Sequence, residues 1–389
     1  MPPFGTFTRY AFDRLLPLCH QRFADALHGG FHERLDATAQ PMPLGYKRSM
    51  VQARQLYVLA HGALQGDHAG QAAAERGYDF LVRHFWDDRH GGWFFKAQPD
   101  GQALDRSKDF YGHAFVMFGL AYAHAAFGAP NAVSLAQETW SVMRDRLAMP
   151  ALTDGGWAGL AEGASADWAL NGAVRRQNPH MHLLEALLAL HEFTGDDAWL
   201  TEATTVINLF RSRFYSVETQ TLGEFFTQDW RPDPATGHIV EPGHHFEWAW
   251  LLDRYVNQGG DVTVLPLADA LFGKAVAHGF LPDGGIMDQM DPQGAPVLRS
   301  RRIWPVAEAI KAALSQARRH QGTSAGDTAW VLAQRLTAHL QAAFLDGQTG
   351  HWVETQDETG RPSMRDLPGS TPYHLFLAAS EAARAEKGA

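Results

Sequence analysis

The chain has 389 residues, of which 45% are hydrophobic and 20% charged, a balance typical of a globular protein with a sizeable core. Its net charge is −10 without any basic block, which excludes nucleic acid and anionic membranes as main partners and favours a neutral, polar small molecule. A single cysteine, Cys19, excludes an internal disulfide. The first residues lack a secretory signal pattern and no apolar run approaches ~20 residues, so we expect a cytoplasmic protein without a membrane helix.

A short glycine-containing pattern recurs along the whole chain, as in GGFHE, GGWFF, GGIMD and GHWVE. Six copies follow one another at steps of about 62, 64, 67, 62 and 65 residues, a spacing that chance does not explain. The sequence therefore predicts six structural repeats. The glycines that mark them are Gly30, Gly92, Gly156, Gly223, Gly285 and Gly350.

Each repeat predicts a hairpin of two helices. The first helix is amphipathic, with apolar residues at i, i+3, i+4 and i+7, as in residues 11–28, 71–86 and 328–345. We expect the glycine, which can adopt positive φ, to end this helix, and a loop of roughly 15–25 residues to follow. The second helix is more apolar. The second helices are predicted at Lys47–Leu64, Asp109–Phe127, Pro179–Phe193, His244–Val256, Trp304–Arg318 and Pro372–Arg384.

The six hairpins favour an all-α fold with the apolar helices inside and the amphipathic helices outside. Such hairpins can close into an (α/α)6 barrel or stack into an open solenoid. The terminal repeats resemble the others, which favours closure, since an open stack needs polar capping repeats. No linker divides the chain, so we predict one domain over residues 1–389, as a monomer or a homodimer, with its long loops on one rim.

Polar residues lie near the start of every inner helix. Because the inner helices run parallel, their N-termini share one rim and these residues converge there. Prolines at Pro179, Pro305 and Pro372 suit the first turn of a helix and fix three of the starts. The candidate site residues are Arg54, Tyr111, Asn178, His182, His244, Glu247, Trp304, Glu308 and His374.

His244 and His374 are candidates for acid–base chemistry. Each lies in the first turn of a helix, where the dipole favours a neutral imidazole with a pKa near ~6.5. Glu247, one turn after His244, could orient that ring or stabilise its protonated form, and Glu308 is a candidate buried partner. The alternative is that the histidines cap loops or fill the core. His244 and Glu247 share a face but offer too few ligands for a metal, so we expect no metal site.

The remaining candidates each admit a binding and a packing interpretation. Arg54 could bind a sugar oxygen or a developing enediolate, or form a salt bridge between inner helices. Tyr111 and Trp304 could stack on a sugar ring or line the core. Glu185 lies one turn after His182 and could orient it.

These residues lie in stretches that resemble the N-acylglucosamine 2-epimerase family over the whole chain. The stretches are QARQ, YGHAFVMFGLA, NPHMHLLEA, GEFFTQDWRP, EPGHHFEWAWLL, RIWPVAEA and PYHLFLA. The resemblance implies an (α/α)6 barrel that acts on free sugars at C1 and C2, as in N-acylglucosamine epimerase, cellobiose 2-epimerase, D-mannose isomerase and sulfoquinovose isomerase. It implies His244 and His374 as the catalytic pair. Supporting or sugar-binding positions would be Arg54, Tyr111, Asn178, His182 and Glu247.

We therefore predict an aldose–ketose isomerase that converts D-mannose to D-fructose through an enediol, without a cofactor. His374 would transfer the proton between C2 and C1, and His244 would act at O1, O2 or O5. A phosphate-cradling glycine loop is not apparent, so we expect an unphosphorylated sugar. Three alternatives stay open: a 2-epimerase, a glycoside hydrolase with Glu247 and Asp288 as opposed carboxylates, and a helical-repeat scaffold that binds protein.

Overall fold

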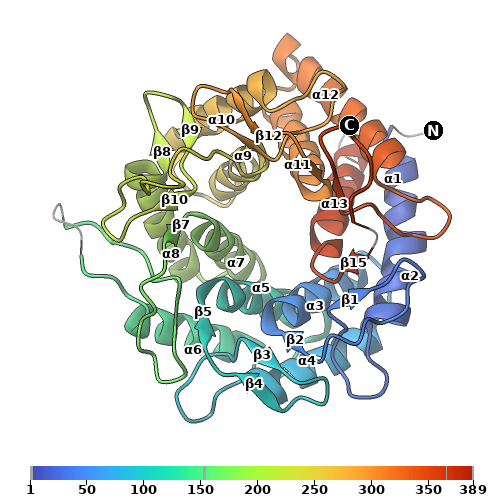
Figure 1. The fold of residues 1–389 in the computed structure, drawn as a ribbon, viewed down its shortest axis with the longest axis vertical. Coiled ribbons are helices and arrows are strands. Elements are labelled where there is room, and N and C mark those ends of the chain that lie inside the picture. Colours follow the sequence, from blue (N-terminus) through green and yellow to red (C-terminus); the bar gives the residue numbers. More distant parts are fainter. Residues whose placement is uncertain (1–2, 152–154, 365, 388–389) are drawn as a thin grey trace.

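Six largely buried helices form the inner wall of a ring in the computed structural model, which describes residues 3–151, 155–364 and 366–387 (Figure 1). The two residues at each end of the predicted domain, 1–389, lie outside the described part. Every inner helix begins and ends within three residues of its predicted bounds. These helices are α3 (Ser49–Leu64), α5 (Phe110–Phe127), α7 (Asn178–Thr194), α9 (Pro242–Asn257), α11 (Ile303–Arg319) and α13 (Pro372–Lys387).

The amphipathic helices surround this wall, as predicted (Figure 1). The first is interrupted: α1 (Gly5–Tyr10) and α2 (Leu16–Leu18) are joined and followed by π-helical turns at Ala11–Leu15 and Cys19–Phe23. Within the described residues, no helix is both long and apolar enough to span a membrane. The other outer helices are α4 (Gln71–Phe85), α6 (Ala132–Arg146), α8 (Asp197–Leu209, continued by a π-helical turn at Phe210–Phe214), α10 (Leu265–His278, after a 3-10 turn at Val262–Val264) and α12 (Ser324–Ala343).

Short strands on one rim, which the periodicity does not predict, tie the hairpins together. Antiparallel pairs join loops of successive repeats in β2–β3, β5–β6, β7–β10 and β13–β14. The strands are β1 (Arg34–Leu35), β2 (Lys47–Arg48), β3 (Lys96–Ala97), β4 (Ala103–Asp105), β5 (Lys108–Asp109), β6 (Gly163–Ala164), β7 (Arg175–Arg176), β8 (Tyr215–Ser216), β9 (Thr221–Leu222), β10 (Phe225–Phe226), β11 (Gln289–Met290), β12 (Pro296–Leu298), β13 (Arg301–Arg302), β14 (Thr355–Gln356) and β15 (Leu367–Pro368).

The first and last repeats meet and close the ring. Strand β1 pairs with β15, so that Arg34 lies opposite Pro368. The backbone N–H of Phe4 donates to Glu386 at 2.6 Å. Figure 1 shows α13 beside α1 and α3, with both chain ends on the same side of the ring. The predicted (α/α)6 barrel is therefore confirmed, and the open solenoid is not what forms.

The repeat register predicted from glycines is wrong in three copies. In each repeat an antiparallel β-bridge joins a residue just after the outer helix to one further along the chain, for example Ala24 to Phe31 and Trp86 to Trp93. The residue just before the second partner of this bridge is the turn position. By this criterion the positions that match Gly30 and Gly92 are Gly159, Thr221, Gly285 and His351. The glycine also lies in a turn beyond the helix end instead of capping it, since the first two outer helices already end at Phe23 and Phe85.

A repeated side-chain clamp explains why this position is crowded. In the first repeat Gln52 accepts from the N–H of Phe31 at 2.7 Å. His113, His180 and His245 occupy the same place in later repeats, where Nε2 accepts from the N–H that follows the turn and Nδ1 donates to the carbonyl four residues earlier. A Cβ added at Gly30 would lie 2.5 Å from the Gln52 oxygen. Three of the 20 histidines are therefore structural.

The clamp predicts a particular loss of stability in acid. Burial lowers the pKa of His113, His180 and His245 to about 3. Their neutral rings therefore stabilise the fold fully above pH ~6.5, and this contribution is lost as the pH falls toward 3. His180→Gln introduces the residue that makes this contact in the first repeat. Below pH ~6.5, the unfolding free energy of this variant should fall less steeply with decreasing pH than that of the wild type, by up to about 1.4 kcal/mol per pH unit.

Urea unfolding at several pH values between 4 and 7 measures the effect. The matched control is His68→Gln, because His68 lies at the surface. Parallel stability curves for the wild type and His180→Gln would show that this ring does not have to stay neutral in the fold.

Candidate functional site

One cavity of about 280 Å³ opens where the six inner helices begin. Every inner helix contributes a residue to its wall, which confirms that the helix starts converge as predicted. Eight of the nine candidate residues line it, and the ninth, Glu308, lies behind His374. The lining residues are Arg54, Tyr111, Arg176, Asn178, His182, Glu224, Phe225, Glu241, His244, Glu247, Arg302, Trp304, Glu354, Ser370, Thr371 and His374.

His244 is buried among carboxylates. Its Nδ1 lies 2.9 Å from Glu224 Oε2 and 3.8 Å from Glu241 Oε2. Burial alone would lower the pKa of His244, but Glu224, through its charge and its hydrogen bond, and then Glu241 and Glu247 raise it to about 9. The ring is therefore charged at neutral pH and can act as an acid. This corrects the expectation of a neutral imidazole, because nearby carboxylates outweigh the helix dipole.

The amide of Asn178 suits both charge states of His244. Its nitrogen lies 3.2 Å from Nε2 and donates to it when the ring is neutral. When the ring is protonated, the amide must turn so that its oxygen accepts, and that oxygen is buried without a hydrogen-bond partner as placed. An amide that can reverse in this way lets His244 both give and take a proton.

His374, unlike His244, is neutral. Burial, followed by the positive charges of Arg54 and Lys311, lowers its pKa well below the usual value of 6.5. Its Nδ1 lies 2.7 Å from Glu308 Oε1. A neutral ring that donates through Nδ1 keeps a lone pair on Nε2, which suits a general base.

Trp304 separates the two imidazoles. Its ring centroid lies 5.0 Å from that of His244 and 5.6 Å from that of His374, tilted by 36° in both cases. A flat apolar surface between an acid and a base can support a sugar ring or chain while each imidazole reaches a different oxygen or carbon. The structure therefore places Trp304 in the cavity wall.

Arg54 lies within the ring of inner helices as a fixed donor. It donates to the Tyr111 hydroxyl at 2.6 Å and to the Ser370 carbonyl at 3.2 Å, and its guanidinium lies 4.0 Å from the Phe115 ring centroid. These contacts differ from the salt bridge between inner helices that was the alternative. A guanidinium held by neutral groups keeps its charge available for an anionic oxygen.

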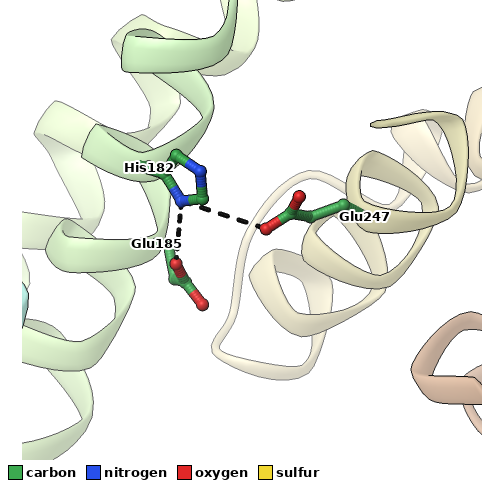
Figure 2. A group of neighbouring side chains, drawn as sticks. All are labelled: His182, Glu185 and Glu247. Carbon is green, nitrogen blue, oxygen red and sulfur yellow. Dashed lines mark hydrogen bonds and ion pairs between the residues drawn. The ribbon is translucent and has the colours of Figure 1, made fainter. Parts of the chain in front are cut away.

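His182 and Glu247, which line the cavity, form a buried group with Glu185 (Figure 2). His182 donates from Nδ1 to Glu185 at 3.2 Å, as predicted from their spacing, while Glu247 approaches the same atom to 3.9 Å. Figure 2 shows Glu247 reaching across from α9 toward α7. Burial, and then the charge of Glu308, raises the pKa of Glu247 well above its usual value. Glu247 therefore binds a proton more readily than a solvent-exposed carboxyl group does.

Glu224 is the main residue that the sequence interpretation missed. Glu247 was expected to support His244, but Glu224 from the loop before α9 makes the hydrogen bond. A signal was present: in five of the six repeats the third residue after the turn position is acidic. In three of them it binds an arginine that precedes the inner helix. These acids are Glu33, Glu162, Glu224, Asp288 and Glu354.

The fourth repeat departs from this pattern in a way that frees Glu224. Glu33 pairs with Arg48, and Glu162 pairs with Arg176. In the fourth repeat Glu241 stands at the arginine's position, so Glu224 turns to His244 instead.

The mouth of the cavity carries further paired charges. Arg302 binds Asp288 at 2.7 Å and Glu241 at 2.9 Å. Asp288 also accepts from the Ser300 hydroxyl, so it is engaged in positioning Arg302 and does not form the opposed carboxylate pair that a hydrolase would need. Within the described residues, two sets of three ligand atoms are close enough to hold a metal: those of His182, Glu185 and Glu247, and those of Glu247, Glu308 and His374.

Comparisons with known proteins agree with this geometry. The chain matches the family described as N-acylglucosamine 2-epimerase over residues 29–378. The chain belongs to this family. It is 33% identical to the mannose-6-phosphate isomerase of Rhizobium meliloti (strain 1021) over 97% of this chain and 96% of that protein.

Two further relatives name related activities. The D-mannose isomerase of Thermobifida fusca is 32% identical, over 88% of this chain and 86% of that protein. The solved structure of the cellobiose 2-epimerase from Spirochaeta thermophila DSM 6192 has a TM-score of 0.86 at 25% identity, over 99% and 96% of the two chains. The chain is an enzyme, a sugar isomerase or 2-epimerase, and the prediction of this class is confirmed.

The contact between Glu224 and His244 yields a direct test. In Glu224→Gln the largest influence that raises the pKa of His244 is lost, so this pKa should fall from about 9 to below about 8. The ring would then lose its proton at a lower pH than in the wild type. Titration of the histidine ring nitrogens by NMR measures the shift without any substrate.

Glu33→Gln is the matched control, since Glu33 occupies the same place in the first repeat but pairs with Arg48. An unchanged titration of His244 in Glu224→Gln would show that other groups hold the proton.

Proposed function

We propose that this protein is an aldose–ketose isomerase that converts free D-mannose to D-fructose. The observation that carries the proposal is the pair of buried imidazoles, His244 charged and His374 neutral, on either side of Trp304 in one small cavity. The reaction needs such a pair, because one group must remove a proton from carbon while another supplies a proton to oxygen. The relative named D-mannose isomerase supports the choice of sugar.

The proton transfers balance between these two rings. In the open-chain aldose, Nε2 of His374 removes the proton from C2 as His244 donates a proton to O1, which gives the enediol. His244 then takes the proton of O2 as the C2 carbonyl forms, and His374 returns its proton to C1. Both rings end in their starting states, and the sugar is neither oxidised nor reduced overall. In the earlier ring opening, His244 would give a proton to O5 and take one from the O1 hydroxyl, so that it is charged again for the enediol step.

Arg54 and the polar floor stabilise charge during these steps. The developing negative charge on O1 and O2 calls for a fixed cation, and Arg54 is held for this by Tyr111 and Ser370. His182 and Glu247 would bind the hydroxyl groups, and neutral His182 would do so as an acceptor through Nε2.

The charges that line the cavity support a sugar without phosphate. Arg176 and Arg302 at the mouth are each bound by carboxylates, at distances of 2.7 to 2.9 Å. A phosphate dianion would also approach Glu241 and Glu354, which line the same cavity. The 33% identical relative is nevertheless named for mannose 6-phosphate, so both sugars belong in the test.

A 2-epimerase is the second candidate, favoured by the structural match to a cellobiose 2-epimerase. It would return a proton to the opposite face of C2, a role that His244 could fill.

The test compares D-mannose with D-mannose 6-phosphate in D2O, followed by proton NMR. We expect D-fructose from D-mannose and little turnover of the phosphorylated sugar, whose charge meets the acidic mouth. His374→Asn should slow the reaction by about 10²- to 10⁴-fold, since it removes the base. D-glucose deuterated at C2 would instead identify an epimerase. Faster turnover of the phosphorylated sugar would contradict the proposal of a free sugar.

A further inference from the structure

Lys311 is a lysine buried completely inside the barrel, on α11 one turn after Glu308. Its side chain is 0% exposed, and its Nζ lies 2.6 Å from Glu308 Oε2. The same ammonium lies 4.0 Å from the centroid of the Trp250 ring. Lys311 does not line the cavity, so the proton transfers assigned to His244 and His374 leave it without a role. A fully buried lysine is rare unless it is paired, which calls for an explanation.

The contacts form a continuous chain from Lys311 to the proposed base. Glu308 is 0% exposed and uses its two oxygens on different partners, Oε2 on Lys311 and Oε1 on His374 Nδ1 at 2.7 Å. Burial raises the pKa of Glu308, and Lys311 is the strongest influence in the opposite direction. Burial alone would lower the pKa of Lys311, but Glu308 and two further glutamates raise it, so the ammonium stays charged.

The groups around this chain come from five inner helices. Removing the ammonium would leave three buried carboxylates near His374 with fewer positive charges to balance them. The titratable and charged groups that face His374 and Lys311 are Arg54 on α3, His182 and Glu185 on α7, Glu247 on α9, Glu308 on α11 and Tyr373 on α13.

We propose that Lys311 is a positioning residue. It holds Glu308 ionised and aligned to accept a hydrogen bond from Nδ1–H of His374, which leaves Nε2 as the free base. The role of His374 as the base rests on the proposed function. Lys311 acts through Glu308 and touches neither sugar nor reacting atoms. Its positive charge also opposes protonation of the imidazole, so His374 stays available as a base at mildly acidic pH.

Lys311→Met, which nearly keeps the length of the side chain but removes the charge, tests this role. Without the ammonium, Glu308 should bind a proton and donate a hydrogen bond to Nδ1 of His374, so that the ring carries its own proton on Nε2 instead of Nδ1. NMR of the histidine ring nitrogens reads this tautomer directly. The result does not depend on turnover, so it stands even if D-mannose is not the substrate. In the active enzyme, kcat should fall because Nε2 is no longer free to act as the base.

Two further variants separate charge from packing. Lys311→Arg keeps the charge, so the ring proton of His374 should stay on Nδ1. Lys311→Gln carries no charge but can still donate to Glu308, and it serves in place of the methionine variant if that variant does not fold. An uncharged variant that folds with the ring proton of His374 still on Nδ1 would overturn the proposal, as would an arginine variant in which that proton moves to Nε2.

Discussion

The site depends on how four of the six inner helices are hydrogen-bonded to the turn that precedes them. Gln52, His113, His180 and His245 each accept a hydrogen bond from the backbone N–H that follows the turn. A buried N–H without a partner is costly, so this contact fixes both the height and the rotation of the helix. Residues two positions before or after the clamp, such as Asn178, His182 and Glu247, therefore project at defined points around the cavity. The geometry of the site follows from this repeated contact.

Within that frame, the neighbours of each imidazole decide its charge. His244 and His374 both lie in the first turn of an inner helix and both are buried, so position alone would give them the same state. Glu224 and Glu241 raise the pKa of His244, while burial beside Arg54 and Lys311 lowers that of His374. Two equivalent positions of a repeat thus become an acid and a base through the loops and helices that surround them.

The fold could be predicted from sequence because a glycine-containing pattern recurs at nearly constant spacing and each repeat carries two helix-like segments. The site could be predicted as far as the helix starts, since Arg54, Tyr111 and the histidines lie on those helices. Glu224 was not predicted because it lies in a loop. Its partner is His244 only because Glu241 stands where three other repeats have an arginine. The prediction of a neutral His244 was wrong for the same reason. A pKa depends on neighbouring groups across the cavity, and spacing along one helix does not reveal them.

The central claim is that two imidazoles of opposite charge face one bound sugar. The most direct measurement is the NMR spectrum of the histidine ring nitrogens of the unmodified protein at pH 7.5, with His244 and His374 assigned by substitution. The account predicts that both ring nitrogens of His244 carry a proton and that His374 carries a proton on Nδ1 alone. Finding the two rings in the same protonation state, or His374 with its proton on Nε2, would contradict it.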